Sequence, residues 1–426
     1  MSSAPRNVAP LVTALCWVVV VFDGYDLIVY GTVLPRLLTE PGWNLTSSTA
    51  GLLGSLAFVG MLLGALLAGR LADALGRRRT ILACTAWFSV FTALCAIAGD
   101  PVVFGAFRLL AGLGLGGLVP SANALGSEFV SARARSVVST IMMSGVPIGG
   151  SLAALIGIAV LPAHGWRAMF AIALVALVVV LPLCAWLLPE SPAWLRARGR
   201  TGQAHALEQR FGLVPEQTQR GAPDSTGFRA LVRPPYTSAT VLFALATLAT
   251  LFAWYGLGTW LPQLMRESGF DLGSSLTFLL ALNLGAVAGS LITAWAGARV
   301  GPRVAAVFAA GAAAVGLLAL VTHPPQLVVY LALVLAGVGT HGTQCLIIAA
   351  VADHYPAPLR GSALGSALGV GRIGAVLAPQ VGGWLLAAGL GVTSNFLVFA
   401  IGAAAASGFV LACPRPVVNP EGAVIR

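Results

Sequence analysis

The sequence of 426 residues contains no lysine and little charge of either sign. Only 9% of its residues are charged, whereas a typical soluble domain carries about 25%, so the composition excludes an ordinary soluble enzyme. Intrinsic disorder is excluded as well, because a disordered chain needs high charge and few apolar residues, and here 58% are apolar. The chain consists instead of recurrent apolar runs of about 20 residues, the length that crosses the hydrocarbon core of a bilayer.

Motifs for metal, redox or nucleotide chemistry are also missing. The six cysteines are scattered, almost all within apolar runs, and no spacing fits a metal or redox site. The glycine cluster at 112–117 lies within an apolar run with no lysine after it, so it predicts close helix packing rather than a phosphate loop. No nucleophile or cofactor loop is visible. We therefore expect a protein that is not an enzyme and that holds no cofactor and no metal.

Breaks at charged, proline and glycine clusters divide the chain into twelve predicted spans. The predicted spans cover 11–35, 49–69, 80–98, 102–126, 136–161, 168–188, 237–262, 274–296, 303–322, 327–352, 362–388 and 393–413. The longest hydrophilic stretch separates six spans from six. We therefore predict an all-α membrane protein with a six-helix bundle at 1–188, a cytoplasmic central loop at 189–236, and a second bundle with a short cytoplasmic tail at 237–426.

The distribution of the 24 arginines predicts the orientation of the chain. With both termini in the cytoplasm, the cytoplasmic segments hold 19 arginines, the external loops hold three and the spans hold two. This bias follows the positive-inside rule, so the net charge of +10 orients the protein in a lipid bilayer and does not indicate nucleic acid as a partner. Since the absence of lysine favours a bacterial source, we expect a multi-pass protein of the bacterial inner membrane, acting as a monomer.

The two halves are related in sequence at one constant offset, the one that separates Tyr30 from Tyr255. Matching pairs include tyrosine, acidic and basic positions, which chance does not readily place in one register. The matches are Tyr30-Gly31 with Tyr255-Gly256, Gly76 with Gly301, Ala111-Gly112 with Ala336-Gly337, Gly117 with Gly342, Glu128 with Asp353, and Arg135 with Arg360. Two parallel six-span repeats are typical of secondary transporters that rock around a site near the bilayer midplane.

Three motifs resemble those of the major facilitator superfamily. The loop between the second and third spans reads Gly69-Arg-Leu-Ala-Asp-Ala-Leu-Gly-Arg-Arg-Arg79 and matches the superfamily signature in spacing and position. In the fourth span, Arg108-Leu-Leu-Ala-Gly112 resembles the second motif, and Pro189-Glu-Ser-Pro192 resembles that of the sugar-porter-like branch. The resemblance covers the whole chain and implies the major facilitator fold.

Two further segments resemble the aromatic acid:proton symporter family of that superfamily. They are Asp23-Gly-Tyr-Asp26 in the first span, and Gly371-Arg-Ile-Gly-Ala375 with Pro379 and Gly382-Gly383 in the eleventh. The resemblance implies import of a small, hydroxybenzoate-like aromatic carboxylate with protons by alternating access. Other organic anions, such as nicotinate or an aliphatic acid, are the alternative, followed by drug export and by ligand sensing without flux.

Four charged residues lie deep within the predicted spans: Asp23, Asp26, Arg108 and Arg372. An intramembrane charge costs about 2.5–3.5 kcal/mol even on a lenient scale, so each needs a partner or a function. A rise of about 1.5 Å per residue places Asp26 and Arg108 at similar depth. We expect Asp26 to carry the coupling proton with Arg108 as its switchable partner, or else a static pair that fixes helix packing. For Asp23, three roles stay open: sharing the proton, bonding a substrate hydroxyl, or lining the outer vestibule.

Arg372 offers a planar guanidinium suited to a substrate carboxylate, with a structural gate formed with Asp23 or Asp26 as the alternative. His341 and Gln344 share a helix face and suit a phenolic hydroxyl, although a lone histidine is often a packing residue. Further substrate candidates are Asn283, with the same polar role, and Tyr30, Trp254 and Tyr255, whose rings suit stacking or the membrane interface.

The remaining charges near the cytoplasmic ends are predicted to form a conformational latch. Asp73 is expected to accept hydrogen bonds from the first amides of span eleven, where the helix dipole favours an anion. Glu128 is expected to pair with Arg77, Arg133 or Arg135, and Asp353 with Arg299 or Arg360. The predicted latch residues are Asp73, Gly76, Arg77, Glu128, Arg135, Asp353 and Arg360. Such pairs would close the cytoplasmic side in the outward-facing state and break when it opens.

Overall fold

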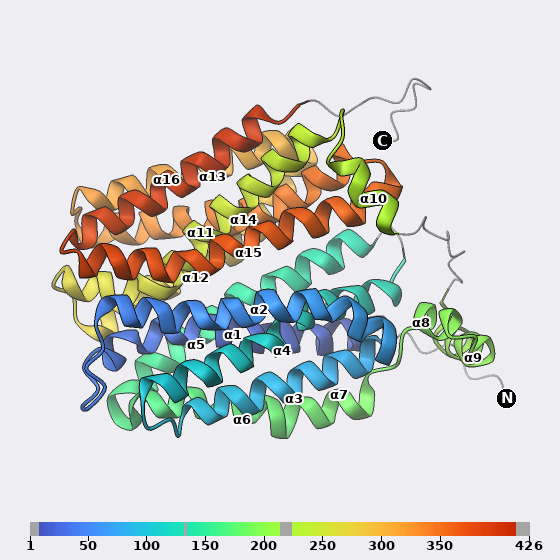
Figure 1. Ribbon diagram of the computed structural model, residues 1–426, viewed down its shortest axis with the longest axis horizontal. Coiled ribbons are helices and arrows are strands. Elements are labelled where there is room, and N and C mark those ends of the chain that lie inside the picture. The colour runs from blue at the N-terminus through green and yellow to red at the C-terminus, as the bar shows by residue number, and fades with distance from the viewer. Residues whose placement is uncertain (1–7, 132–133, 214–223, 415–426) are drawn as a thin grey trace.

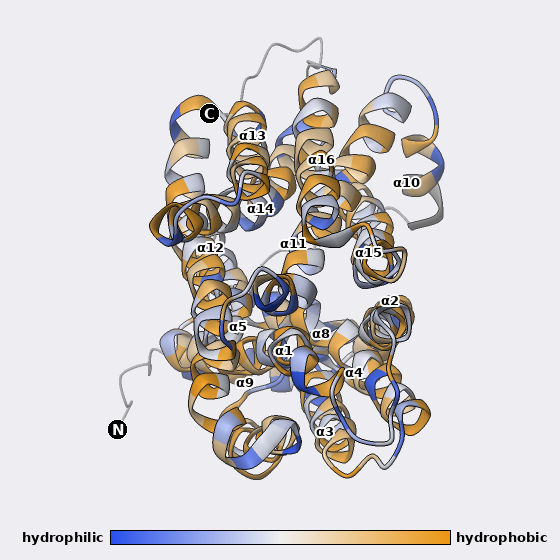
Figure 2. Cartoon of the chain, turned by 90° about the vertical axis from the view of Figure 1, so that its left-hand side faces the viewer, coloured by the Kyte–Doolittle hydropathy of each residue, from blue (hydrophilic) through white to orange (hydrophobic). Residues whose placement is uncertain are grey.

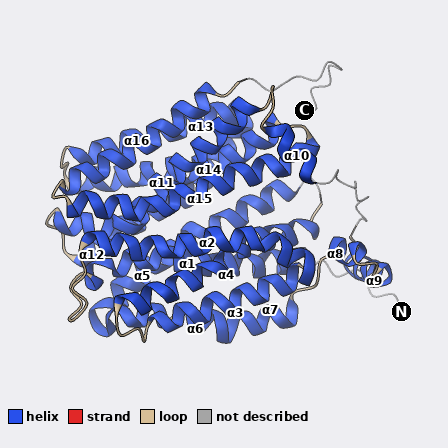
Figure 3. Cartoon of the chain, in the orientation of Figure 1, coloured by secondary structure: helices blue, strands red, loops and turns tan. Residues whose placement is uncertain are grey.

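The computed structural model describes residues 8–131, 134–213 and 224–414, and within these ranges every regular element is helical (Figure 3). Ten of the described helices are long and apolar enough to cross a membrane. An eleventh span, α3 (Arg77–Cys95), begins with three consecutive arginines, and the twelfth runs from the kink at Gly165 through three short helical pieces. The predicted all-α fold with twelve transmembrane helices is confirmed.

Two bundles of six spans lie side by side, one from each half of the chain (Figure 1). The first half contains α1 (Ala9–Leu37), α2 (Ser47–Leu75), α3, α4 (Pro101–Glu128), α5 (Arg135–Ala171), α6 (Ala173–Val175), the π-helical η2 (Ala176–Val180) and α7 (Leu181–Leu187). The second half contains α11 (Thr237–Glu267), α12 (Leu272–Val300), α13 (Pro302–Val321), α14 (Gln326–His354), α15 (Ala357–Ala387) and α16 (Gly391–Ala412). Between them lie α8 (Pro192–Ala197), α9 (Thr201–Phe211) and α10 (Asp224–Leu231).

We call the end of the molecule that carries α8, α9, α10 and the turn from α2 to α3 the basic end, which is on the right in Figure 1. The other is the opposite end. Several helices begin at side-chain caps: Thr46 and Thr49 form a capping box on α2, and the Asp100 carboxylate accepts from two amides of α4. At the basic end, Gly76 makes the tight turn before α3 with a φ of +97°, a conformation that favours glycine.

The helices of both bundles are rich in hydrophobic residues, coloured orange in the view from the opposite end (Figure 2), and many of these side chains are exposed on the outside of the bundles. Large side chains such as Leu66, Trp186, Leu291 and Phe308 are strongly exposed there. A soluble protein would bury such a surface or use it as an interface. Around twelve membrane-length helices it is the surface that a lipid bilayer covers.

Corresponding helices of the two halves make corresponding packing contacts. A Cβ atom placed on Gly112 of α4 would lie 2.1 Å from the Ala57 carbonyl oxygen of α2. A Cβ atom on Gly337 of α14, the repeat position, would lie 2.0 Å from the Leu282 carbonyl oxygen of α12. Ala57 and Leu282 are related by the same offset as the two glycines, so the two halves pack the corresponding helices in the same register.

The buried apolar side chains show where the halves meet. At the opposite end they form one cluster that draws on both halves, including Tyr30 and Leu257. Toward the basic end the larger clusters are separate: one around Phe88 and Leu125 draws almost wholly on the first half, with Ala375 its member from the second, and one around Phe243 belongs to the second half. The halves are therefore packed together at the opposite end and separate toward the basic end (Figure 1).

Along one face of α15, the side chains and backbone are packed against α2 at the opposite end and lose these contacts toward the basic end. Gly383 lies against the Ser47 backbone of α2, and the Val376 carbonyl accepts a hydrogen bond of 2.7 Å from Ser55 Oγ. On the same face toward the basic end, a Cβ atom placed on Gly361, Gly365 or Gly369 would meet nothing within 4 Å. The chain therefore adopts an arrangement that is closed at the opposite end and open toward the basic end.

Candidate functional site

Asp26 is the centre of a buried cluster built by three helices of the first half. Its Oδ2 accepts a hydrogen bond of 2.9 Å from Arg108 Nη1 of α4, and its Oδ1 accepts one of 2.6 Å from Thr92 Oγ1 of α3. Arg108 Nη2 also donates to the Asp26 backbone carbonyl at 3.3 Å, and both charged side chains are only 1% exposed. Since all three residues belong to one half, a rigid rotation of the halves would leave these distances unchanged.

Aromatic rings surround the guanidinium of Arg108. Its Cζ atom lies 5.9 Å from the ring centres of both Tyr30 and Phe170. The Tyr30 hydroxyl donates to the Ala50 carbonyl at 2.6 Å, so this predicted stacking residue uses its polar group within the first half. The rings limit the access of water to the ion pair and keep its attraction strong.

Asp23 lies one turn from Asp26 on the same helix, but its surroundings differ. Its side chain is 1% exposed, and neither carboxylate oxygen has a hydrogen-bond partner among the described residues. The charged groups that act on it are Asp26 of its own helix and Arg372 of the second half. Burial without a partner is costly for a carboxylate, so Asp23 is the charged position that the first half leaves unsatisfied.

Arg372 is the central residue of α15 and the point where the packed interface with α2 ends. Its Nη1 donates to the Met61 carbonyl of α2 at 3.3 Å, and the side chain is half-buried. Just beyond it toward the basic end, Gly369 faces open space. A guanidinium thus lies at mid-membrane depth, between the halves, at the inner limit of the open side.

Two aromatic pairs lie near these charges. The Tyr255 ring of α11 packs on Phe58 of α2 with 4.6 Å between ring centres, across the boundary between the halves. The neighbouring Trp254 packs on His341 of α14 at 5.4 Å. Tyr255 is also within the electrostatic range of both Asp23 and Arg372. Of the predicted aromatic residues of the second half, Tyr255 therefore lies near Arg372, whereas Trp254 lies beside His341.

Three predicted polar residues of the second half are buried with an unpartnered acceptor. Asn283 Nδ2 donates to the Leu279 carbonyl at 2.9 Å, which leaves Oδ1 facing Gly150 of the first half. Among the described residues, Asn283 Oδ1, Gln344 Oε1 and His341 Nε2 have no hydrogen-bond partner. Each can accept a hydrogen bond, and an unmet buried acceptor costs about 1–3 kcal/mol, so the set favours a ligand that donates.

A comparison with known proteins identifies the family. The model of the Major Facilitator Superfamily matches residues 16–379 and 279–424. The chain belongs to the major facilitator superfamily. Arg372 and the Tyr255–Phe58 pair lie at the boundary between the two six-helix halves, where transporters of this kind bind their substrates, and the Asp26 cluster lies within the first half.

Curated relatives of the chain are similar over nearly the whole length. The gentisate transporter of Corynebacterium glutamicum is 54% identical over 386 residues, which cover 90% of this chain and 82% of that protein. The benzoate transport protein of Acinetobacter baylyi is 34% identical and covers 92% and 86% of the two chains. A 4-hydroxybenzoate transporter of the same organism is 31% identical, with 93% and 89% covered. These relatives are transporters, and the chain is not an enzyme.

Solved structures share the fold at low sequence identity. The xylose transporter XylE from E. coli, in a partially occluded inward open conformation, has a TM-score of 0.75 at 17% identity and covers 95% of this chain and 98% of that one. Its inward open conformation has a TM-score of 0.74 at 16% identity. The resemblance to the major facilitator fold inferred from the sequence motifs is therefore confirmed.

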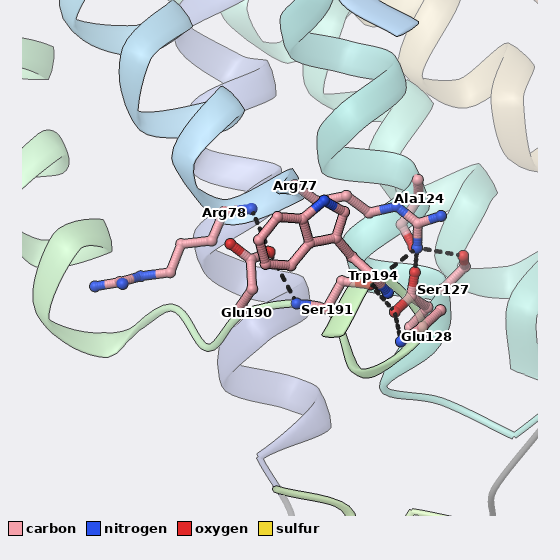
Figure 4. Close-up of polar contacts among 9 residues, drawn as sticks. Arg77, Arg78, Ala124, Ser127, Glu128, Glu190, Ser191 and Trp194 are labelled. Carbon is pink, nitrogen blue, oxygen red and sulfur yellow. Dashed lines mark hydrogen bonds and ion pairs between the residues drawn. The ribbon is translucent and has the colours of Figure 1, made fainter. Parts of the chain in front are cut away.

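One predicted latch pair, Glu128 with Arg77, is formed within the first half although the basic end is open, so the expectation that this pair breaks on opening is wrong. Glu128 at the end of α4 forms an ion pair with Arg77 at the start of α3, and Glu128 Oε2 accepts from Ser191 Oγ at 2.5 Å (Figure 4). Glu190 Oε1 accepts from the Arg78 amide at 3.0 Å and so caps α3. A Cβ atom on Gly76 would lie 2.5 Å from the Glu190 carboxylate, which would have to shift. The segment after the sixth span, which contains Glu190 and Ser191, is therefore held against the first half by these hydrogen bonds.

The predicted latch contacts of Asp73 and Asp353 are not assembled in this arrangement. The Asp73 side chain is exposed, and its backbone carbonyl accepts from Trp194 Nε1 at 2.9 Å. Among the described residues, Asp353 forms no ion pair, while Arg360 Nε donates to the Tyr355 carbonyl at 2.9 Å. Arg299 lies over the Trp295 ring at 5.1 Å, Arg135 begins α5, and Arg133 is outside the described residues.

Sequence reasoning missed two partners. Thr92 completes the hydrogen bonding of Asp26, but a threonine in an apolar run gives no sign of the direction in which its hydroxyl points. Ser191 belongs to a motif that the sequence displayed, yet its bond to Glu128 joins residues 63 positions apart. No spacing rule connects such positions.

Proposed function

We propose that the chain is a proton-coupled secondary transporter that imports a small aromatic carboxylate of the hydroxybenzoate type, with gentisate as the first candidate. The observation that carries the proposal is the position of Arg372, a half-buried guanidinium between the halves and beside the Tyr255 ring. The names of the relatives support the substrate class, since three of them are gentisate, benzoate and 4-hydroxybenzoate transporters.

Each chemical part of such a substrate has a complementary group at the site. The guanidinium of Arg372 suits a carboxylate, because its planar fork can donate two parallel hydrogen bonds. The rings of Tyr255 and Trp254 offer surfaces for the benzene ring. The unpartnered acceptors of His341, Gln344 and Asn283 suit phenolic hydroxyls, which donate hydrogen bonds.

Coupling to protons is assigned to the buried charges of the first half: Asp23 is the carboxylate whose surroundings change with conformation, and Asp26 is held by Arg108. A carboxylate in the membrane interior carries a proton when it is unpaired and releases it when a cation approaches, so its protonation follows conformation. Alternating access would move the halves about this site. The Arg77–Glu128 pair lies within the first half and is formed with the basic end open, so closure of that end in the outward-facing state is assigned to Asp73 and Asp353, whose predicted contacts are not formed among the described residues. The described arrangement, open at the basic end, is then the inward-facing state.

The basic end is assigned to the cytoplasm, with both termini on that side, because the arginines gather there. Arg36, Arg167 and Arg266 belong to helix ends at the opposite end, which would face outward. We assign the protein to the bacterial inner membrane, where lipid covers its apolar surface, and expect a monomer. The substrate and protons are its only required partners.

Uptake of labelled gentisate into proteoliposomes tests the proposal. An inward proton gradient should drive accumulation above the external concentration, and a protonophore should abolish it. Unlabelled benzoate, 4-hydroxybenzoate and nicotinate in excess should rank the carboxylates by competition. Vesicles that contain folded protein but accumulate none of these acids under a proton gradient would contradict the proposed function.

A further inference from the structure

The two carboxylates of α1 are held in different ways, and this difference divides their roles. Asp26 accepts hydrogen bonds from Arg108 and Thr92, so both of its oxygens are satisfied within the first half. Asp23 has no hydrogen-bond partner on either oxygen among the described residues. A movement of one half against the other therefore changes the surroundings of Asp23 far more than those of Asp26.

The groups that face Asp23 come from four helices. On its own helix Asp26 repels a negative charge, while Arg372 of α15 attracts one from the other half. The titratable neighbours are Cys84 of α3 and Tyr255 of α11, both ordinarily neutral. Since Arg108 is occupied by Asp26, Arg372 is the cation that can compensate an ionised Asp23.

Arg372 and Asp23 are not in ion-pair contact in the described arrangement. The guanidinium instead donates to the Met61 carbonyl, a weak partner for a full positive charge. The guanidinium can therefore bind one carboxylate, either that of Asp23 or that of a substrate, by donating hydrogen bonds to it. Two carboxylates competing for one guanidinium give a direct route by which substrate binding changes the protonation of the protein.

We propose that the substrate carboxylate replaces Asp23 as the counter-charge of Arg372 and that the Asp23 carboxylate then takes up the proton that is co-transported. The inference rests on the proposed function and assigns the mobile proton to Asp23, in place of the Asp26 carrier expected from the sequence. Asp26 remains ionised and fixed to Arg108. The step balances in charge: one substrate anion enters the site, one proton forms an O–H bond on Asp23, and one negative carboxylate balances the charge of Arg372 before and after.

Charge compensation then explains why both solutes must move together. In the empty protein the Asp23 carboxylate compensates Arg372, and in the loaded protein the substrate carboxylate does so while Asp23 is neutral. Substrate bound beside an ionised Asp23 leaves an unpaired negative charge in the membrane interior, and a proton on Asp23 without substrate leaves Arg372 unpaired. Because an unpaired buried charge is costly, only the two compensated forms can close around the site.

Proton uptake on binding tests the assignment in the purified full-length protein. In weakly buffered detergent solution near neutral pH, where gentisate is an anion, a pH-indicating dye should report about one proton taken up per gentisate bound by the wild type. The Kd for gentisate should rise by up to about tenfold for each unit of increasing pH. Asp23→Asn should bind gentisate with no proton uptake and with a Kd that does not depend on pH.

Two comparisons make the result specific. Asp100→Asn, which retains the oxygen that caps α4, should behave as the wild type does. Full proton uptake by Asp23→Asn would overturn the inference. Binding of gentisate by the wild type without proton uptake would overturn it as well, and this second result does not require any variant to fold. A wild type that binds neither gentisate nor benzoate would instead contradict the proposed function, on which the inference rests.

Discussion

Arg78 and Arg303 occupy corresponding positions of the two repeats, and each donates to a backbone carbonyl near the end of the last span of its own half. The acceptor of Arg78 is Ala185, and Arg303 Nε donates to Val410 at 3.1 Å. Ala185 and Val410 correspond to each other at the same offset. The last carbonyls of a helix have no partner within it, so these arginines satisfy corresponding groups in both bundles.

Replacement of Arg303 by alanine should therefore lower the stability of the second half. Arg303 also donates to the carbonyls of Leu411, Cys413 and Pro414, so its loss leaves several carbonyls without a donor. We expect a loss of about 1–3 kcal/mol, with a smaller loss for Arg303→Lys, seen as a lower Tm in detergent. Arg299→Ala, at an exposed position nearby, is the control; an Arg303→Ala protein with the same Tm as this control would refute the capping role.

The pair of Asp26 and Arg108 should be detectable as a coupled unit. Asp26→Asn leaves a buried guanidinium without its carboxylate and should cost about 3–5 kcal/mol, whereas replacing both partners by neutral residues costs less. Thermal unfolding of Asp26→Asn, Arg108→Gln and the double variant completes a double-mutant cycle. Additive losses of the two single variants in the double variant would show that the pair does not interact.

Loss of the guanidinium at position 372 should weaken the binding of carboxylates. Arg372→Ala should raise the KM for gentisate about 100-fold or abolish transport, because a charge-assisted bidentate bond is worth about 3 kcal/mol. Arg372→Lys keeps the positive charge but cannot donate two parallel hydrogen bonds, so its KM should lie between those of the wild type and Arg372→Ala. The KM values are measured from uptake kinetics in proteoliposomes. Arg266→Ala, at the exposed end of α11, is the control. An unchanged KM for gentisate in Arg372→Ala would show that Arg372 does not bind the carboxylate.

The unpartnered acceptors should discriminate between hydroxylated and plain benzoates. Gln344→Leu removes an acceptor while keeping a side chain of similar size, so the KM for gentisate should rise by about 5- to 30-fold, which corresponds to one hydrogen bond of about 1–2 kcal/mol. The KM for benzoate, which has no hydroxyl, should change little. Gln326→Leu at the exposed start of α14 is the matched control. Equal changes for both acids would show that Gln344 does not contact the hydroxyl groups.

The face of α15 predicts a gradient of solvent access. In a chain whose native cysteines have been replaced, Gly369→Cys should react rapidly with a membrane-impermeant thiol reagent applied from the basic end in inside-out vesicles. Val376→Cys, two turns further along the same face and packed against α2, should react slowly. Bound gentisate should protect position 369. Similar rates at the two positions would contradict an arrangement open only at the basic end.

Features that depend on periodicity and repetition could be predicted from the sequence. The twelve spans follow from apolar runs of membrane length, and the constant offset between the halves anticipated the matching contacts of Gly112 and Gly337. Depth arithmetic placed Asp26 and Arg108 at one level, and the structure brings them into contact. These predictions needed only the position of each residue along its helix axis.

Other features needed the direction of a side chain or the conformational state. Thr92 was missed because depth does not tell which neighbour a hydroxyl faces. The different surroundings of Asp23 and Asp26 could not be read from their spacing, since two residues one turn apart share a helix face. Asp73 was expected to contact the start of α15, but that contact needs the two basic ends to meet, and the sequence alone does not state which arrangement is adopted.

The proton movement itself tests proton-coupled import most directly. Proteoliposomes with a pH-sensitive dye inside, no initial pH gradient and the membrane potential held at zero should receive an inward gradient of gentisate. Symport predicts that the lumen becomes more acidic as gentisate enters, and that Arg372→Ala abolishes the change. Entry of gentisate with no acidification of the lumen would contradict proton coupling while leaving the transport of the acid in place.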